Sequence, residues 1–283
     1  MLRVIVSGYS GKMGQVVCEI CKEEPDTQVV AGIARDVIAP AQGSRYATLE
    51  GIPASGVMPA RLMTNLEGRH NGEATFSVFS NAKACDVSAD VIIDFSNPEA
   101  LTPLLEMAVA THTPIVVCTT GIGDKGFDAL NEAAKDIAVF YAANMSLGVN
   151  LLAKLVKEAA TLYHKGFDIE IVEKHHSRKL DAPSGTALLL ADAANTSLGG
   201  VLEYTHGRHN SSKRRAKEEL GIHALRGGTI VGEHSVLLAG DDEVIELRHS
   251  AISKAVFARG ALAAARFVAT REAGLFGMED LLA

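Results

Sequence analysis

The sequence is poor in several of the residues that define specialised protein classes. It has no tryptophan, 5% aromatic residues and only four cysteines among 283 residues. No apolar run approaches the roughly 20 residues that a membrane-spanning helix needs, and the N-terminus lacks the apolar region of a signal peptide. Acidic residues outnumber basic ones by 34 to 27, so a net charge of −7 gives no general attraction for nucleic acid or anionic membranes. We therefore expect a cytoplasmic protein with no nucleic-acid or membrane partner.

The four cysteines, Cys18, Cys21, Cys85 and Cys118, provide no disulfide framework, because thiols stay reduced in the cytosol. Cys18 and Cys21 have the C-x-x-C spacing of redox and zinc pairs. They lie within an apolar pattern of helical period, and no second Cys or His pair is placed to complete a four-ligand zinc site. We interpret them as packing residues and expect no metal.

The length and the 47% hydrophobic content predict about two globular domains, each with its own core. A strand at Leu2–Ser7, a helix reaching about Glu24 and a strand at Thr27–Ile33 form a βαβ unit. Such a unit predicts an α/β fold with a doubly wound parallel sheet of the Rossmann type. Further strands are expected at Phe76–Phe79, Val91–Phe95, Ile115–Cys118 and Ile137–Tyr141, with helices at Pro98–Thr111 and Lys125–Ala134. The segment Val37–Gly72 is interpreted as irregular.

After Asn150 the pattern changes to that of a second α/β region. We expect helices at Leu151–His164 and Thr186–Thr196, and strands at Asp168–Glu173, His223–Leu225, Thr229–Leu238 and Val244–His249. Successive strands with short turns predict an antiparallel or mixed sheet. The basic stretch Gly207–Lys217 is interpreted as a solvated loop. An amphipathic helix is expected at Ala255–Arg271.

A G-x-x-G-x-x-G loop, Gly8–Gly14, connects the first strand to the first helix. Glycines at such a turn let backbone N–H groups approach a pyrophosphate at the positive end of the helix. The cofactor-binding residues predicted here are Gly8, Tyr9, Ser10, Gly11, Lys12 and Met13. The alternative is a turn that only packs helix against strand.

The residues after the second strand bear on which dinucleotide is bound. Dinucleotide-binding folds that use NAD place an acid about 20 residues after the glycine loop, where it binds the ribose hydroxyls. Here that position holds Ala34, followed by Arg35. A guanidinium matches phosphate oxygens, so Arg35 predicts the 2′-phosphate of NADPH, with NADH also usable. Arg35 as an ordinary surface arginine remains an alternative.

The stretch Glu173–Thr186 gathers hydrogen-bond donors within fourteen residues: His175, His176, Lys179, and a Ser184-Gly185-Thr186 helix start. Ser184 is a good N-cap, and the N–H groups at a helix start bind anions. A histidine and a lysine can deliver protons. This set suits a carboxylate-bearing substrate that must be protonated, the alternative being a strand end with a solvated lysine. Zinc is less favoured, because adjacent strand residues point to opposite faces.

Six motifs in order along nearly the whole chain resemble the 4-hydroxy-tetrahydrodipicolinate reductase (dihydrodipicolinate reductase) family of bacterial lysine and diaminopimelate biosynthesis. They are Gly8–Gly14, Asp94–Pro98, Thr119–Gly121, Ala143–Asn150, Glu173–Thr186 and Arg226–His234. The resemblance implies a dinucleotide-binding domain of residues 1–146 with 255–283. It also implies a substrate-binding and oligomerisation domain of residues 147–254, with homotetramers formed through the sheets of that domain.

The resemblance also implies roles for individual residues. His175 and Lys179 match the catalytic pair, while His176, Ser184, Gly185 and Thr186 match the substrate-binding residues. Loops beside the nicotinamide correspond to Cys118, Thr119, Thr120, Ala142, Ala143, Asn144 and Met145. The sequence departs from the family at Cys118, where glycine is usual, at Asn97 and Lys254, where arginine occurs, and at Ala34, where an acid is frequent.

We therefore expect an NAD(P)H-dependent oxidoreductase that reduces a cyclic, unsaturated dicarboxylate. Two alternatives stay open. An amino-acid or semialdehyde dehydrogenase of the same two-domain plan would not need the His-His-x-x-Lys loop. A non-catalytic nucleotide-sensing protein would bind the cofactor without any substrate-dependent oxidation of it.

Overall fold

The computed structural model describes residues 1–34, 76–209 and 214–283. The chain divides into two compact units, residues 1–145 with 257–283, and residues 146–256. Arg35 and the segment Val37–Gly72 lie outside the described residues. Within the described part of the chain, no helix is long and apolar enough to span a bilayer.

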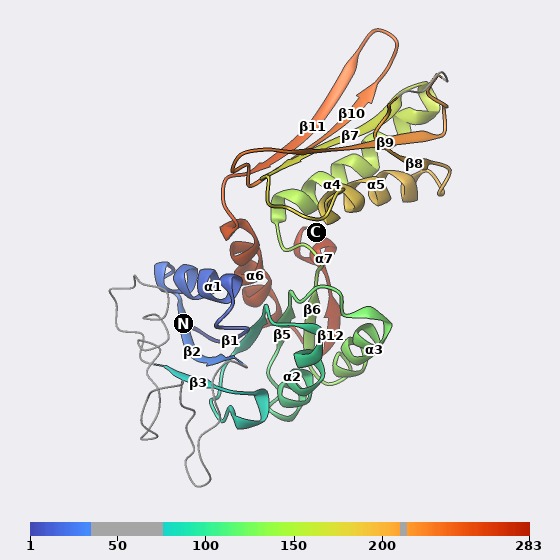
Figure 1. Cartoon of the computed structure of the whole chain (residues 1–283). Helices are drawn as coiled ribbons and strands as arrows, with labels where there is room; N and C mark the ends of the chain where they lie inside the picture. Colours follow the sequence, from blue (N-terminus) through green and yellow to red (C-terminus); the bar gives the residue numbers. More distant parts are fainter. Residues whose placement is uncertain (35–75, 210–213) are drawn as a thin grey trace. The chain divides into compact units, whose positions relative to one another are not determined.

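The first unit holds a seven-stranded parallel sheet with the strand order β12–β6–β5–β4–β1–β2–β3 (Figure 1). The strands are β1 (Leu2–Ser7), β2 (Thr27–Ile33), β3 (Ser77–Phe79), β4 (Val91–Asp94), β5 (Ile115–Val117), β6 (Ala138–Tyr141) and β12 (Gly274–Phe276). All residues of β4 and β5 are buried. Such unbroken burial is typical of strands covered by helices on both faces.

The helices of this unit are α1 (Lys12–Glu23), η3 (Ala82–Ala84), α2 (Pro98–Ala110), α3 (Gly123–Ala133), most of α6 (Ala255–Val268) and α7 (Met278–Leu281). Figure 1 shows α1 and α6 on one face of the sheet, and α2 and α3 on the other. Arg259 and Arg266 of α6 form ion pairs with Glu23, Glu24 and Asp26 at the end of α1. This arrangement is the doubly wound fold predicted from the sequence.

The second unit holds a five-stranded mixed sheet with the order β11–β10–β7–β9–β8. Its elements are α4 (Leu147–Ala159), η4 (Ala160–Lys165), β7 (Asp168–His175), α5 (Gly185–Ser197), β8 (Glu203–His206), β9 (Glu219–Arg226), β10 (Gly232–Ala239) and β11 (Val244–Ala251). Strand β7 alternates strictly between half-buried and buried residues. Its buried side faces α4 and α5, while no described helix covers the opposite face of the sheet (Figure 1).

Some sequence-based boundaries were wrong for local reasons. Helix α4 begins at Leu147 rather than Leu151, because the Ser146 hydroxyl accepts a hydrogen bond from the Val149 amide and caps the helix. The short strands β8 and β12 were not predicted. The described ends of the basic stretch are not simply solvated, because Arg208 and Arg215 both form ion pairs with Glu170.

Candidate active site

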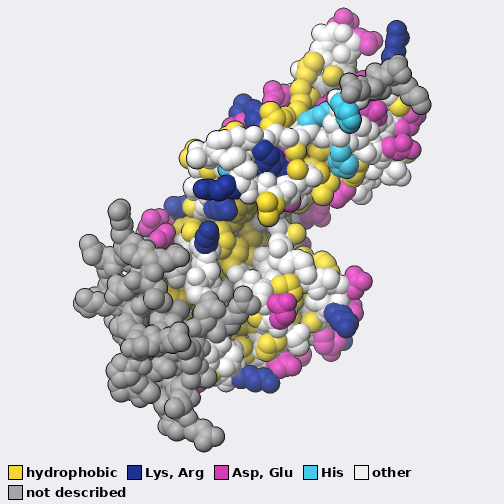
Figure 2. Space-filling model, viewed as in Figure 1, with side chains coloured by type: hydrophobic (Ala, Val, Ile, Leu, Met, Phe, Trp, Pro, Cys, Tyr) yellow, Lys and Arg dark blue, Asp and Glu magenta, His cyan; other side chains and the backbone are white. Residues whose placement is uncertain are grey.

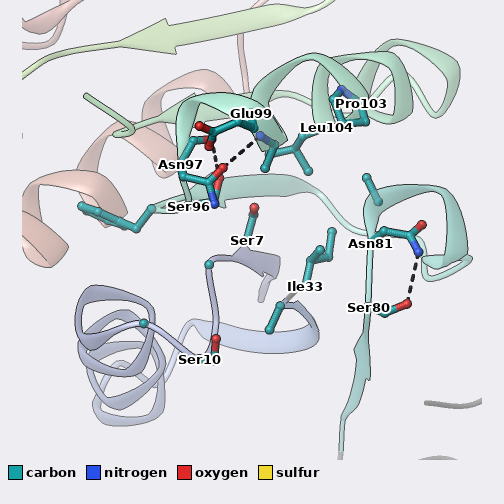
Figure 3. Close-up of a pocket in the computed structure, with 16 residues that line it drawn as sticks. Ser7, Ser10, Ile33, Ser80, Asn81, Ser96, Asn97, Glu99, Pro103 and Leu104 are labelled. Atoms are coloured by element: carbon teal, nitrogen blue, oxygen red, sulfur yellow. Dashed lines mark hydrogen bonds between the residues drawn. The ribbon is translucent and has the colours of Figure 1, made fainter. Parts of the chain in front are cut away.

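A cavity of about 570 Å³ lies at the carboxyl ends of β1, β2, β3 and β4. Its lining includes Ser7, Gly8, Ser10, Gly11, Ile33, Ala34, Ser80, Asn81, Phe95, Ser96, Asn97, Glu99, Pro103 and Leu104. Figure 3 shows that lining residues come from separate elements, among them Ser7, Ile33 and Asn97. Strand order reverses between β1 and β4, and ligands of open α/β sheets bind at such a switch point. The sequence had singled out Gly8, Ser10, Gly11, Ala34 and Asn97 individually, and Phe95 and Ser96 within the motif Asp94–Pro98.

The glycine loop packs closely against the end of β4. Gly8 has a φ of +76°, and a Cβ atom there would lie 2.5 Å from the Phe95 carbonyl oxygen. A Cβ at Gly14 would lie 2.2 Å from the Gly8 carbonyl oxygen. Both glycines are therefore required by packing, so the structural interpretation of the loop holds alongside the cofactor-binding one.

Several N–H groups of the loop are already used within the protein. The Gly8 and Tyr9 amides donate to the Ile33 carbonyl, and the Gly11 amide donates to Gly8. The amides of Lys12 and Met13 open α1 and have no acceptor within the helix, and no described side chain caps that terminus. A pyrophosphate fits this arrangement, because the free amides and the helix dipole both favour an anion.

Tyr9 differs from the other predicted cofactor contacts. Its side chain is only 2% exposed and packs edge-on against Phe76, with ring centroids 5.5 Å apart. A Cβ at Gly32 would lie 2.9 Å from the Tyr9 ring. Tyr9 is therefore a core residue, and its amide and carbonyl groups are already bonded to Ile33 and Gln15.

The predicted nicotinamide loops follow β5 and β6. Cys118 is buried, and burial raises the pKa of its thiol well above the ordinary value, so it stays neutral. Thr119 is also buried, whereas Thr120 is exposed. After β6, Ala142 and Asn144 are half-buried, Ala143 is exposed and Met145 is buried. These residues sit at the same edge of the sheet as the cavity but do not line it.

The C-x-x-C pair lies in α1, as the packing interpretation requires. Cys21 is 1% exposed and Cys18 is half-buried. Burial raises the pKa of the Cys21 thiol to about 11, and that of Cys18 is also raised. Thiols of this kind remain protonated at neutral pH and are poor nucleophiles.

In the second unit, a buried carboxylate organises the predicted catalytic loop. Glu173, which has no exposed surface, accepts hydrogen bonds from both terminal nitrogens of Arg226 at 2.7 and 2.8 Å. It also accepts from the Ser184 amide at 3.0 Å, and its Oε2 lies 2.6 Å from Nδ1 of His175. The sequence placed Glu173 and Arg226 in informative motifs but gave neither residue a role.

His175 and Lys179 occupy different surroundings. His175 is 8% exposed at the end of β7, whereas Lys179 lies in the following loop with Nζ 2.7 Å from Oδ2 of Asp181. His176 is half-buried, and desolvation together with Arg178 and Lys254 lowers its pKa. Lys254, a departure from the family pattern, thus contributes positive charge beside His176.

The N-terminus of α5 completes the group. Ser184 caps it by accepting from the Ala187 amide at 3.2 Å, which confirms the predicted N-cap. The Ser184 hydroxyl also lies 2.9 Å from Nε2 of His234, a histidine that sequence reasoning missed. Gly185 and Thr186 form the first turn of this helix, and the space beside Gly185 is open. Carboxylate binding is the chemistry this terminus favours.

The chain matches two sequence models of one family, described as the N-terminus (residues 2–145) and the C-terminus (148–282) of dihydrodipicolinate reductase. The second model covers the second unit together with the last segment of the first unit. The 4-hydroxy-tetrahydrodipicolinate reductase of Caldanaerobacter subterraneus subsp. tengcongensis is 44% identical over 282 residues, covering 100% of this chain and 98% of that protein. The corresponding protein of Clostridium novyi is 39% identical with the same coverage.

The fold is similar to that of a dipicolinate-bound dihydrodipicolinate reductase from Paenisporosarcina sp. TG-14. The TM-score is 0.74, with 22% identity and 99% of each chain covered. A probable dehydrogenase from Thermotoga maritima is more distant, with a TM-score of 0.56, 13% identity, and coverage of 99% of this chain and 92% of that one.

Proposed function

This chain belongs to the dihydrodipicolinate reductase family of NAD(P)H-dependent enzymes, and we propose that the two sites described above divide that reaction between them. The crevice of the first unit, which is the cavity at the carboxyl ends of β1 to β4, binds the dinucleotide. The loop Glu173–Thr186 of the second unit binds 4-hydroxy-tetrahydrodipicolinate and protonates its ring after the 4-hydroxyl group has left as water and the hydride has been added. One observation carries the proposal: the buried Glu173 carboxylate is hydrogen-bonded both to His175 and to the Ser184 amide, and so holds His175 beside the N-terminus of α5.

The crevice fits a dinucleotide by its volume, its place at the switch point and the open amides of α1. When bound, NAD(P)H supplies the hydride. The chain's own part is to hold the pyrophosphate at Lys12 and Met13, and to shape the nicotinamide end with Cys118–Thr120 and Ala142–Met145.

The substrate carries two carboxylates. The amides of Gly185 and Thr186, together with His176, are placed to bind one of them, because a helix N-terminus favours an anion. The related protein with dipicolinate bound supports a planar dicarboxylate as the ligand class. Lys179 and the neighbouring cations orient the carboxylates and stabilise the negative charge that develops after hydride arrival. His175 or Lys179 then protonates the resulting enamine-like carbon.

The cofactor preference rests on the residues after β2. Ala34 is 3% exposed and lines the crevice, so no carboxylate stands at that position to repel a phosphate. Arg35 follows directly in the sequence. We therefore assign NADPH as the preferred cofactor, with NADH usable.

A tetramer is supported by the uncovered face of the five-stranded sheet. Leu225 and Val244 lie on it and are 48% and 61% exposed. On the visible face of this unit, Figure 2 shows charged, histidine and apolar side chains interspersed. Light scattering after size exclusion should give the mass of four chains, and Leu225→Glu should lower it. The four free cysteines fit a cytoplasmic location.

The deciding experiment follows NADPH oxidation at 340 nm with freshly generated product of dihydrodipicolinate synthase. Oxidation that depends on that product supports the proposed reaction. Cofactor binding without product-dependent oxidation indicates a nucleotide sensor. Oxidation with an amino acid or semialdehyde instead would assign the chain to the alternative dehydrogenase reaction.

A further inference from the structure

Both carboxylate oxygens of Glu173 are occupied by donors from three elements. Arg226 ends β9 and reaches Oε1 and Oε2 with its two terminal nitrogens. Ser184, the N-cap of α5, donates its amide to Oε1 at 3.0 Å. His175, two residues along β7, presents Nδ1 to Oε2 at 2.6 Å. The carboxylate is thus fixed in position and completely enclosed.

Glu173 is ionised in this environment. Burial alone would raise the pKa of its carboxyl, but hydrogen bonds from Arg226, His175 and the Ser184 amide outweigh burial and lower the pKa below its usual range. An ionised carboxylate only accepts hydrogen bonds. Nδ1 of His175 must therefore carry a proton and donate it to Oε2.

The other ring nitrogen of His175, Nε2, lies beside Gly232. A Cβ atom at Gly232 would lie only 3.1 Å from Nε2 of His175. Glycine at this position leaves room at Nε2, whereas Nδ1 is enclosed. Nε2 is thus the nitrogen available to a substrate.

We propose that Glu173, held by Arg226, is a positioning residue that keeps the proton of neutral His175 on Nδ1 and so makes Nε2 the atom that delivers the catalytic proton. This inference rests on the proposed function, in which His175 protonates the reduced substrate. In that step the Nε2–H bond of the imidazolium breaks and a C–H bond forms at the enamine-like carbon. The neutral ring keeps its Nδ1–H bond to Glu173, and the carboxylate takes up no proton.

The chain contains a matched control on the same strand. Glu170, on the opposite face of β7, is bound by Arg208 and Arg215 and lies 3.0 Å from Nε2 of His223. These hydrogen bonds outweigh burial and lower the pKa of Glu170 to about 2. Among the described residues, this second Glu–His–Arg cluster has no helix N-terminus as a hydrogen-bond partner. A variant at Glu170 therefore separates the effect of losing an ion pair from the effect of losing the positioning of His175.

The test is Glu173→Gln, which keeps the size of the side chain. With its carbonyl oxygen in the place of Oε1, it can still accept from one terminal nitrogen of Arg226 and from the Ser184 amide. Its amide NH₂ then faces Nδ1 of His175 and the other terminal nitrogen of Arg226. Two donors cannot bond, so the ring should switch to the tautomer protonated at Nε2. Nitrogen-15 NMR of histidine-labelled full-length protein, at about pH 8.5 where an ordinary imidazole is neutral, distinguishes the two tautomers. The His175 signals are assigned by their loss in His175→Asn.

We expect wild type to show the Nδ1–H tautomer and Glu173→Gln the Nε2–H tautomer. Turnover should fall by about 100-fold or more in Glu173→Gln, because a ring with no acceptor at Nδ1 cannot become the imidazolium that donates its Nε2 proton. The KM for NADPH should stay within about threefold. Glu170→Gln should lose thermal stability but keep its turnover within about threefold and its His175 tautomer. Glu173→Asp keeps the charge and should recover part of the turnover.

An unchanged tautomer in Glu173→Gln, or an unchanged turnover, would overturn the inference. Equal losses of turnover in Glu170→Gln and Glu173→Gln would reduce Glu173 to a structural role. The tautomer is measured without substrate, so it is independent of the reaction. Failure of wild-type protein to oxidise NADPH would instead refute the proposed function.

Discussion

The hydroxyl of Thr119 donates a 2.7 Å hydrogen bond to the fully buried carboxyl group of Asp94. Asp94 ends β4, between Ser7 of β1 and Val117 of β5 in the register of the sheet. It also accepts from the Ser96 amide at 3.2 Å. Burial raises its pKa, although these hydrogen bonds act in the opposite direction. One carboxyl group thus connects the loops that follow β4 and β5 at the cofactor crevice.

Thr119→Val should therefore leave one Asp94 oxygen without its donor. An unsatisfied buried acceptor costs about 1–3 kcal/mol, so urea unfolding should show a loss of that size, together with a raised KM for NADPH. The double variant with Asp94→Asn should lose less than the sum of the single losses. Strict additivity would show that the two side chains act independently.

Lys179→Met should lower turnover by about 100-fold or more, the scale for loss of a general acid. Binding of NADPH should not change, because the dinucleotide site lies in the other unit. Lys174→Met is the matched control, since Lys174 is also ion-paired, to Glu233 at 3.2 Å, and should keep turnover within about twofold. Stopped-flow and steady-state kinetics of wild type, Lys179→Met and Lys174→Met measure these turnover rates. A near-normal rate in Lys179→Met would exclude Lys179 from the mechanism.

Arg35→Ala tests the cofactor assignment. A charged hydrogen bond contributes about 1.5–3 kcal/mol, so the KM for NADPH should rise roughly tenfold or more. The KM for NADH should stay almost constant, because its remaining contacts come from the glycine-loop backbone. Each cofactor serves as the control for the other. Equal weakening of both would mean that Arg35 supports the loop or the adenine instead of the 2′-phosphate.

His234 should make stability depend on pH. Burial lowers its pKa from the ordinary 6.5 to about 4. Between these values the unfolded chain binds a proton that the folded chain does not, so stability falls as the pH drops from 6.5 to 4 and is unaffected by this group above that range. His234→Gln can still bond Ser184 but cannot titrate.

Urea unfolding of wild type and His234→Gln at several pH values measures the difference. The slope of unfolding free energy against pH should be smaller in the variant, by up to about 1.4 kcal/mol per pH unit within this window. A loss of packing in His234→Gln lowers the unfolding free energy equally at every pH, so it does not change the slope. Identical slopes would show that His234 is protonated in the folded protein.

The sequence was sufficient to predict an element where a local pattern of residues determines its bounds. The ends of β1 and β2 were predicted to the residue, because continuous apolar runs meet Gly8 on one side and Pro25 on the other. Short edge strands were missed, because three residues such as Gly274–Phe276 carry no periodicity. The pairing of β12 depends on β6, which is more than 130 residues away in the chain.

In the candidate site too, local features could be predicted from the sequence, whereas contacts between distant segments could not. The helix start at Ser184 could be predicted from local sequence, and so could the donor-rich loop around His175. The partners of Glu173 could not, since Arg226 lies 53 residues further along the chain and His234 bonds Ser184 across 50 residues. Only the register of β7 with β9 and β10 brings them together. The motif Arg226–His234 was the available signal.

Strand β12 pairs with β6 through Gly274–Ala138 and Phe276–Phe140, and its segment follows the whole second unit in the chain. During synthesis, the second unit therefore leaves the ribosome before the first can be completed. Until residues 257–283 emerge, β6 is an exposed sheet edge, open to pairing with another nascent chain. The first unit is therefore the one whose synthesis begins first and whose sheet is completed last.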